Sequence, residues 1–264
     1  MTLDAATEKL FKRDRLITLG GLIVITALAW LYLQALAAEM NDMRSMDGMA
    51  AMARLRPWTA TDAWLTFVMW AVMMVAMMAP SATPVILLYA RIYRGRDDER
   101  QPLAPTGAFF LGYIAVWIAF SLAMTALQWG LEQMALLSPM MTSASPVFGG
   151  LVLIAAGVYQ WLPAKNVCLG HCRSPVHFLS THWRAGAPGA FRMGLEHGVY
   201  CLGCCWVLMI LLFVGGVMNL LWVAAMAVFV LVEKAAPFGR MAGRAGSILL
   251  IVGGIAVLSG SGAV

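Results

Sequence analysis

The chain has 264 residues, of which 61% are hydrophobic and only 12% are charged, and its formal net charge is +5. Soluble domains carry about 25% charged residues, so this composition excludes a soluble globular protein and predicts a protein embedded in lipid. The basic residues are spread over several segments and do not form the patch typical of nucleic-acid binding.

Seven apolar runs follow one another along the chain, and each is long enough, alone or with its flanks, to cross a hydrocarbon core of about 30 Å. They cover residues 16–38, 64–90, 106–129, 146–163, 190–214, 220–234 and 245–261. The sixth is the weakest of them, because Glu233 and Lys234 end it. We therefore expect an all-α, polytopic membrane helix bundle of about seven transmembrane helices, with residues 1–264 forming a single domain.

The distribution of basic residues predicts the orientation of these helices. With the N-terminus in the cytoplasm, all but three of the 18 Lys and Arg residues lie in cytoplasmic segments, the exceptions being Arg44, Arg54 and Arg56. Cytoplasmic loops of membrane proteins are enriched in these residues, so we predict a cytoplasmic N-terminus in a multi-pass plasma (inner) membrane protein. The first apolar run has about 23 residues, against about 7–15 in a cleaved signal peptide, so we expect an uncleaved anchor.

Methionine is concentrated around the second predicted helix, in a chain that has 20 of these residues. The loop before that helix places one at every third position, at Met40, Met43, Met46, Met49 and Met52. The helix itself contains four that span roughly 140° of its surface, Met73, Met74, Met77 and Met78. Pro80 follows and should kink the helix beside them. Thioethers bind Cu(I) without losing a proton, and the alternatives are gap filling in the helix bundle and, for the loop, an amphipathic segment on the membrane surface.

The loop between the fourth and fifth predicted helices contains the motif C-x-x-H-C, formed by Cys168, His171 and Cys172. Its order differs from the C-x-x-C-H of haem attachment, and the spacing of the two cysteines suits one face of a helical turn. They can bind a soft ion or relay it to the fifth helix. All five cysteines lie in this loop or in the cytoplasmic half of that helix, where thiols stay reduced and act as ligands rather than form disulfides.

The fifth predicted helix carries the strongest candidate site, in the stretch GLEHGVYCLGCCWVLM. His197, Cys201 and Cys204 fall within roughly 60° on one helix face, and Cys205 adjoins them. Ligating side chains at membrane depth indicate function, and thiolate, imidazole and a thioether from the second helix suit Cu(I). Zn²⁺ is the competing ion, with Cys205 or Glu196 completing four ligands. Cysteines that only pack as small apolar residues are the structural alternative.

Two carboxylates, Glu196 and Glu233, lie nearest to the predicted hydrocarbon region. Their functional interpretation is charge balance for a bound cation, or a proton path. Their structural interpretation is an ion pair with Arg192 or Lys234 at the cytoplasmic interface. Glu196 is favoured for function because it adjoins His197, and both remain candidates.

Three motifs occur in a fixed order: MWAVMMVAMMAPSATP, YQWLPAKNVCLGHCRSP and GLEHGVYCLGCCWVLM, followed by GVMNLLW and EK. Over roughly Trp64 to Pro237, the chain resembles a bacterial family described as predicted metal-binding integral membrane proteins, some of whose members are called copper chaperones. The resemblance implies metal handling in a bacterial inner membrane. The functional set that it implies comprises Met73, Met74, Met77, Met78, Cys168, Cys172, Glu196, His197, Cys201, Cys204, Cys205 and Glu233.

The residues together predict a membrane protein that binds a soft metal ion between its second and fifth helices and accepts, transfers or exports it. Cu(I) is the favoured ion and zinc the second. The expected partners are membrane lipid, the metal ion and a copper-donor or copper-acceptor protein, without nucleic acid. Binding is favoured over enzymatic activity, and no phosphate-binding loop of an ATPase occurs in the sequence. The alternatives are a membrane thiol oxidoreductase that uses the cysteine cluster and a structural membrane subunit.

Overall fold

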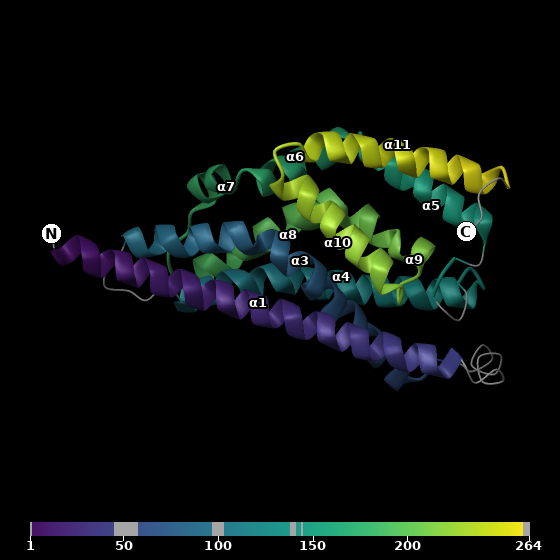
Figure 1. Ribbon diagram of the computed structural model, residues 1–264, viewed down its shortest axis with the longest axis horizontal. Coiled ribbons are helices and arrows are strands. Elements are labelled where there is room, and N and C mark those ends of the chain that lie inside the picture. The colour runs from purple at the N-terminus through teal and green to yellow at the C-terminus, as the bar shows by residue number, and fades with distance from the viewer. Residues whose placement is uncertain (1, 45–57, 97–102, 138–140, 144, 261–264) are drawn as a thin grey trace.

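The computed structural model describes residues 2–44, 58–96, 103–137, 141–143 and 145–260 (Figure 1). In these residues the regular structure is helical, apart from an isolated bridge between Leu137 and Ser143. The helices are α1 (Thr2–Arg44), α3 (Ala60–Arg96), α4 (Leu103–Gln133), α5 (Pro146–Tyr159), α6 (Pro163–Arg173), α7 (Pro175–His182), α8 (Gly186–Ile210), α9 (Leu212–Gly215), α10 (Leu220–Ala235) and α11 (Gly239–Leu258). Three methionines of the predicted outer series, Met46, Met49 and Met52, lie outside the described residues.

The all-helical prediction is therefore confirmed for this part of the chain. Five stretches are long and apolar enough to cross a membrane: Lys12–Met40, Ala60–Gly95, Leu103–Gln133, Gly186–Gly215 and Gly239–Leu258. The α5–α6 pair adds a sixth if it is taken as one span bent by 65°. The fourth and sixth predicted runs form helices of only 14 and 16 residues, short of the roughly 20 that a straight span needs. Pro163 starts α6 and thereby separates it from α5, because proline fits the first turn of a helix but not its interior.

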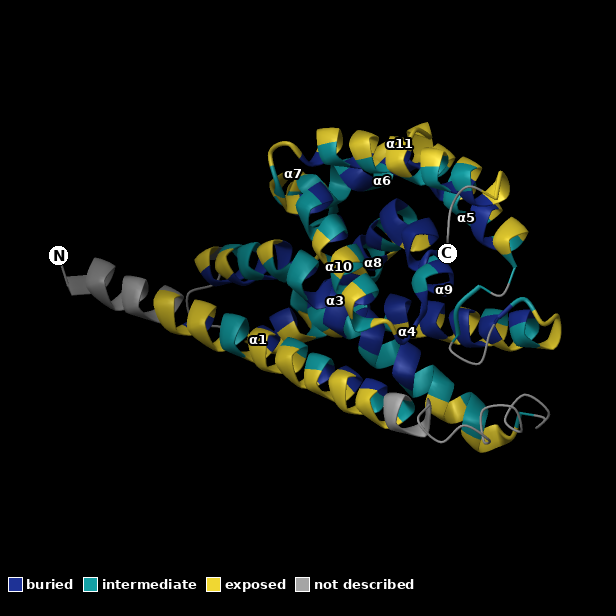
Figure 2. Ribbon diagram, turned by 45° about the vertical axis from the view of Figure 1, so that its right-hand side comes forward, coloured by how far each residue is buried: buried dark blue, intermediate teal, exposed yellow. Residues whose placement is uncertain are grey.

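The helices pack in layers, with α3, α4, α8 and α10 between α1 on one side and the pair of α5 and α11 on the other (Figure 1). α8 lies along α4, α5 lies along α11, and α3 packs against both α1 and α4. The exposed residues gather on the outward faces of α1 and α11, and the buried ones lie between them (Figure 2). Gly112 of α4 and Gly194 of α8 allow the closest approach, since a Cβ at either would collide with backbone of the other helix. Small residues at such crossings bring membrane helices close together.

The second predicted helix forms as α3, with Pro80 and Pro84 inside it. The ribbon of α3 changes direction partway along its length (Figure 1), which is the expected effect of interior prolines. Beside them the carbonyl of Met78 accepts hydrogen bonds from Ser81 Oγ at 2.9 Å and from Tyr113 Oη at 3.2 Å. The bent segment is thereby tied to α4, which carries Tyr113.

Two buried ion pairs fasten helices to one another. Arg94 pairs with Asp14 and joins α3 to α1, while Lys165 pairs with Glu233 and joins α6 to α10. Arg173 of α6 also donates to the carbonyls of Glu233 and Ala236 at the end of α10, where a cation complements the last carbonyls of a helix. These contacts hold α6 in place over α8 and α10.

Candidate metal centre

The cysteines of α8 lie on its buried face, as their spacing predicts. His197, Cys201, Cys204 and Cys205 are each at most 3% exposed, and all the cysteines of the chain are free thiols. The thiols of Cys204 and Cys205 each donate to the backbone carbonyl of Cys201 at 3.0 Å. Three sulfur atoms therefore gather within about one turn of a single helix.

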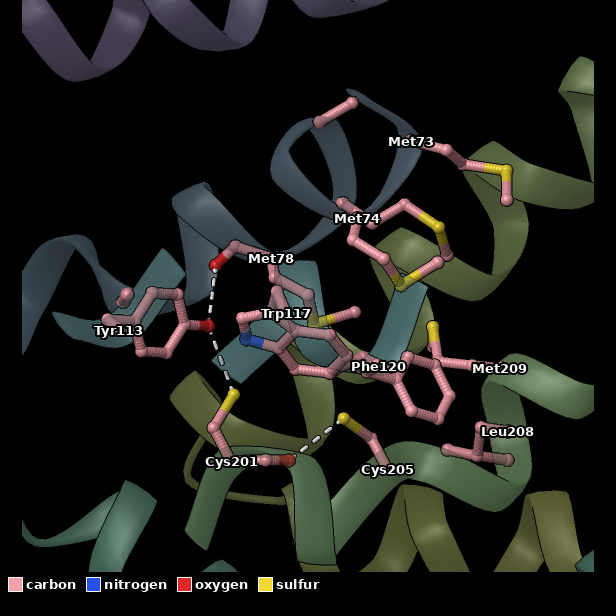
Figure 3. Close-up of a cluster of buried hydrophobic side chains, with 14 of the residues drawn as sticks. Met73, Met74, Met78, Tyr113, Trp117, Phe120, Cys201, Cys205, Leu208 and Met209 are labelled. Carbon is pink, nitrogen blue, oxygen red and sulfur yellow. Dashed lines mark hydrogen bonds between the residues drawn. The ribbon is translucent and has the colours of Figure 1, made fainter. Parts of the chain in front are cut away.

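Cys201 is the point at which side chains of two other helices meet α8. Its Sγ lies 3.0 Å from the hydroxyl of Tyr113 on α4 and accepts from Nζ of Lys234 on α10 at 2.9 Å. The Tyr113 hydroxyl also donates to the carbonyl of Met78, so a chain of hydrogen bonds runs from α3 to α8 (Figure 3). The second and fifth predicted helices thus approach one another through side chains of α4 and α10.

The α3 methionines are fully inside the protein. Met73, Met74, Met77 and Met78 are at most 1% exposed. They share one buried cluster with the α8 cysteines and Met209, and in Figure 3 Trp117 and Phe120 lie between Met74 and Cys205. Thioethers and thiols therefore occupy the same dry interior, which is the environment expected for soft ligands.

The loop motif folds as α6 and brings two more thiols to this interior. Cys168 Sγ lies against Gly203 of α8, where a Cβ would come within 2.7 Å of the sulfur. The partly buried Cys172 packs against the buried cluster that contains Cys201 and Cys204. The structure thus brings together the loop cysteines and the helix cysteines.

Within the described residues, no three His, Cys, Asp or Glu side chains are arranged as a ready metal-binding group. The thiols near Cys201 are instead held by Tyr113, by Lys234 and by a backbone carbonyl. The cluster therefore consists of soft donors that are close to one another and engaged in hydrogen bonds.

His197 lies in a pocket of aromatic rings one turn before Cys201. The ring centroids of Phe178, Tyr113 and Phe109 are 5.0, 5.9 and 6.2 Å from that of the imidazole. Its Nδ1 is buried and has no hydrogen-bond partner among the described residues. Buried polar atoms normally have a partner, so this nitrogen is available to a ligand.

The two candidate carboxylates are engaged in ion pairs. Glu196 contacts Arg184 at 3.2 Å and Arg192 at 3.4 Å, which matches the structural interpretation of its role. Glu233 pairs with Lys165 rather than with the expected Lys234, because adjacent residues on a helix point about 100° apart. Glu233 thus joins α6 to α10, whereas Glu196 pairs within α8 and with the segment just before it.

Lys234 is the residue that sequence reasoning missed. Its Nζ lies 2.9 Å from Cys201 Sγ, 3.4 Å from Ser81 Oγ and 3.9 Å from Cys205 Sγ. From sequence it marks only the end of the sixth apolar run. The adjacent Glu233 and Lys234 in an apolar segment were the signal that could have found it. Neighbouring residues of a helix point in different directions, so the two side chains need separate buried partners.

Comparison with known protein families gives a match over most of the chain. The family model PpoB2, described as copper chaperone, matches residues 67–257. No curated protein and no solved structure matches the chain. The matched region contains the α3 methionines, α6 and the α8 cysteines, so the resemblance of the motifs is confirmed and extends into α11.

Proposed function

The chain belongs to the copper chaperone family, and from this premise we propose that it binds Cu(I) as its cargo inside a membrane helix bundle. The observation that carries the proposal is the shared buried cluster of the α8 thiols and the α3 thioethers. Thiolate and thioether sulfur are the ligands that select Cu(I) over harder ions. The thiols of Cys201 and Cys205 are the proposed primary ligands, because both lie in this cluster beside Lys234.

The other candidate residues act in this proposal as additional ligands or as a transfer pair. Imidazole nitrogen is an acceptable Cu(I) ligand, and the unpartnered Nδ1 of His197 supports its use. The α3 thioethers add neutral donors. Cys168 and Cys172 form an exchange pair, since their packing against the cluster of the α8 thiols supports transfer of the ion from one thiol to the next. Transfer then leads to or from a copper-donor or copper-acceptor protein.

The proposal places the protein in a bacterial inner membrane, as one domain of seven crossings in contact with lipid and with a cytoplasmic N-terminus. The excess of basic residues in the predicted cytoplasmic segments supports this orientation. The five long apolar stretches supply five crossings. The bent α5–α6 pair and the shorter α10 supply the other two.

A thiol–disulfide function is the second candidate, and one observation favours it. Cys168 and Cys172 on α6 pack against the buried cluster that contains Cys201, Cys204 and Cys205 on α8. Forming a disulfide across this contact would release two electrons and two protons, which would pass to the disulfide of a substrate protein and reduce it to two thiols. The two functions differ in a product that can be measured, because oxidoreductase activity leaves an intramolecular disulfide and cargo binding leaves a bound metal.

The deciding experiment is metal analysis of full-length protein purified anaerobically in detergent and loaded with Cu(I) under reducing conditions. We expect copper near one ion per chain, lost when Cys201→Ser and Cys205→Ser are combined. Glu196→Gln is the control, since its carboxylate is held by arginines, and it should retain the copper. A wild-type protein that retains no copper would contradict the proposal. A Cys172 disulfide trapped by alkylation and mass spectrometry, without bound metal, would favour the thiol–disulfide function.

A further inference from the structure

A buried lysine lies among the thiols of the candidate centre, and the copper proposal gives its charge no role. We propose that Lys234 is the fixed counter-charge of this centre and makes it selective for a monovalent soft cation over a divalent one. The inference rests on the proposed function, because it concerns the same thiols.

The surroundings of Lys234 direct its charge toward sulfur. The residue is 7% exposed, and Nζ has three acceptors around it: Cys201 Sγ, Ser81 Oγ and Cys205 Sγ. The nearest carboxylate in sequence, Glu233, is engaged by Lys165 on the other side of α10. An ammonium has three N–H donors, so these acceptors account for all of them.

The net charge of the occupied centre differs between a monovalent and a divalent cation. When two thiols bind a monovalent cation, each gives up its proton to solvent, and the dithiolate complex carries one negative charge that the ammonium neutralises. The same two thiolates bound to a divalent cation form a neutral complex, so the ammonium leaves one positive charge uncompensated. A net charge in a buried site is unfavourable. Thioether ligands are neutral, so the count holds whether or not methionines complete the coordination.

A third thiolate would restore neutrality for a divalent ion, and the structure indicates what that requires. The Cys204 thiol donates to the backbone carbonyl of Cys201 at 3.0 Å. The Cys205 thiol makes the same hydrogen bond, but Cys201 and Cys205 have sulfur atoms that accept from Lys234, whereas Cys204 does not and would have to be brought to them. The arrangement therefore favours two anionic sulfur ligands, which is the number that one ammonium and one monovalent ion neutralise.

The test compares Ag(I), as a monovalent soft probe, with Cd(II), as a divalent thiophilic probe, on the full-length protein in detergent. The variants are Lys234→Met and Lys234→Gln, which remove the charge, and Lys234→Arg, which keeps it. Arg240→Met removes an exposed charge from α11 as the matched control. We expect the Ag(I)-over-Cd(II) preference to fall at least about tenfold in the two neutral variants, and to persist in Lys234→Arg and in the control.

A second measurement needs no variant. The wild-type preference is compared with that of dithiothreitol, a dithiol with no ammonium beside it, and should be shifted toward Ag(I) by at least about tenfold. An unchanged preference in folded Lys234→Met, or no shift relative to dithiothreitol, would overturn the role of Lys234 while leaving metal binding intact. Wild-type protein that binds neither ion would instead remove the proposed function itself.

Discussion

The side chains around Cys201 differ in what they can give to a metal ion. Thiols bind as anions, thioethers bind as neutral donors, and the imidazole of His197 offers a buried Nδ1. Replacing a thioether by an alkyl group removes a donor atom without changing charge and with little change in volume. The buried methionines of α3 are therefore the residues at which packing and metal binding can be separated.

Met74→Leu combined with Met78→Leu should leave the fold nearly intact and weaken Cu(I) binding. Both side chains are buried in the sulfur-rich cluster, and volume-conserving core substitutions usually cost less than about 1.5 kcal/mol. Thermal unfolding in detergent measures the stability of the fold, and Cu(I) competition titration measures the copper affinity. Met226→Leu on α10 is the control, because Met226 is only partly buried. Wild-type copper affinity in the double variant would mean that these methionines only pack.

Single-residue contacts could be predicted only in part. The spacing of His197, Cys201 and Cys204 was enough to predict a shared buried face, because helical periodicity fixes which residues face the same way. The partners of charged residues depend on which helices become neighbours. Sequence proximity suggested Lys234 as the partner of Glu233, whereas tertiary packing brings Lys165 to the carboxylate and leaves Lys234 with the thiols.

Among the elements, α6 has the clearest relation to the site. It is an eleven-residue helix that carries Cys168 and Cys172, and it is fastened to α10 through Lys165 and Glu233 and through Arg173. A helix this short is marginal in isolation. Its position against α8 therefore depends on these side-chain contacts.

Glu233→Gln should destabilise the protein by about 3–5 kcal/mol, because it leaves the Lys165 ammonium buried without its counter-charge. Release of α6 should also speed alkylation of Cys168, which thermal unfolding and timed mass spectrometry would detect. Lys165→Met combined with Glu233→Leu is the matched control, since an apolar pair avoids the unpaired charge and should recover much of the stability. Unchanged Cys168 reactivity in Glu233→Gln would show that other contacts suffice to hold α6.

The helices themselves were predictable from long apolar runs, and their exact extents were not. Hydropathy indicates where the chain meets an apolar environment, but it does not distinguish a full crossing from a helix that ends early at a proline. The run over residues 146–163 illustrates this, because α5 stops at Tyr159 and α6 continues in another direction. The C-x-x-H-C loop formed a helix because Pro163 begins its first turn.

At the scale of the whole molecule, contacts assign the helix ends to two groups. Asp14 pairs with Arg94, and Tyr89 stacks on Trp183 at 5.4 Å between ring centroids, so the start of α1, the end of α3 and the segment after α7 lie together. At the opposite end of α3, Trp58 donates to Glu132 at 2.7 Å. The first group contains the basic residues that predict the cytoplasmic side.

Introduced cysteines can test this orientation in intact cells. Met134→Cys and Val176→Cys place thiols at exposed positions, one beside Glu132 and one on α7. A membrane-impermeant maleimide should label the first from outside the inner membrane and the second only after permeabilisation, because the proposed topology puts α7 in the cytoplasm. The parent protein, whose native thiols are buried or half-buried, gives the background. The reverse pattern would invert the proposed orientation.

Glu233 and Lys234 are adjacent in α10 but contact different helices. Glu233 pairs with Lys165 of α6, and Lys234 donates to Cys201 of α8. This turn of α10 therefore contacts both α6 and α8. A cation bound at Cys201 lies beside the Lys234 ammonium, and the neighbouring Glu233 connects the same turn to the helix that carries Cys168 and Cys172. The inner and the outer thiols are therefore linked through two adjacent residues of a single helix.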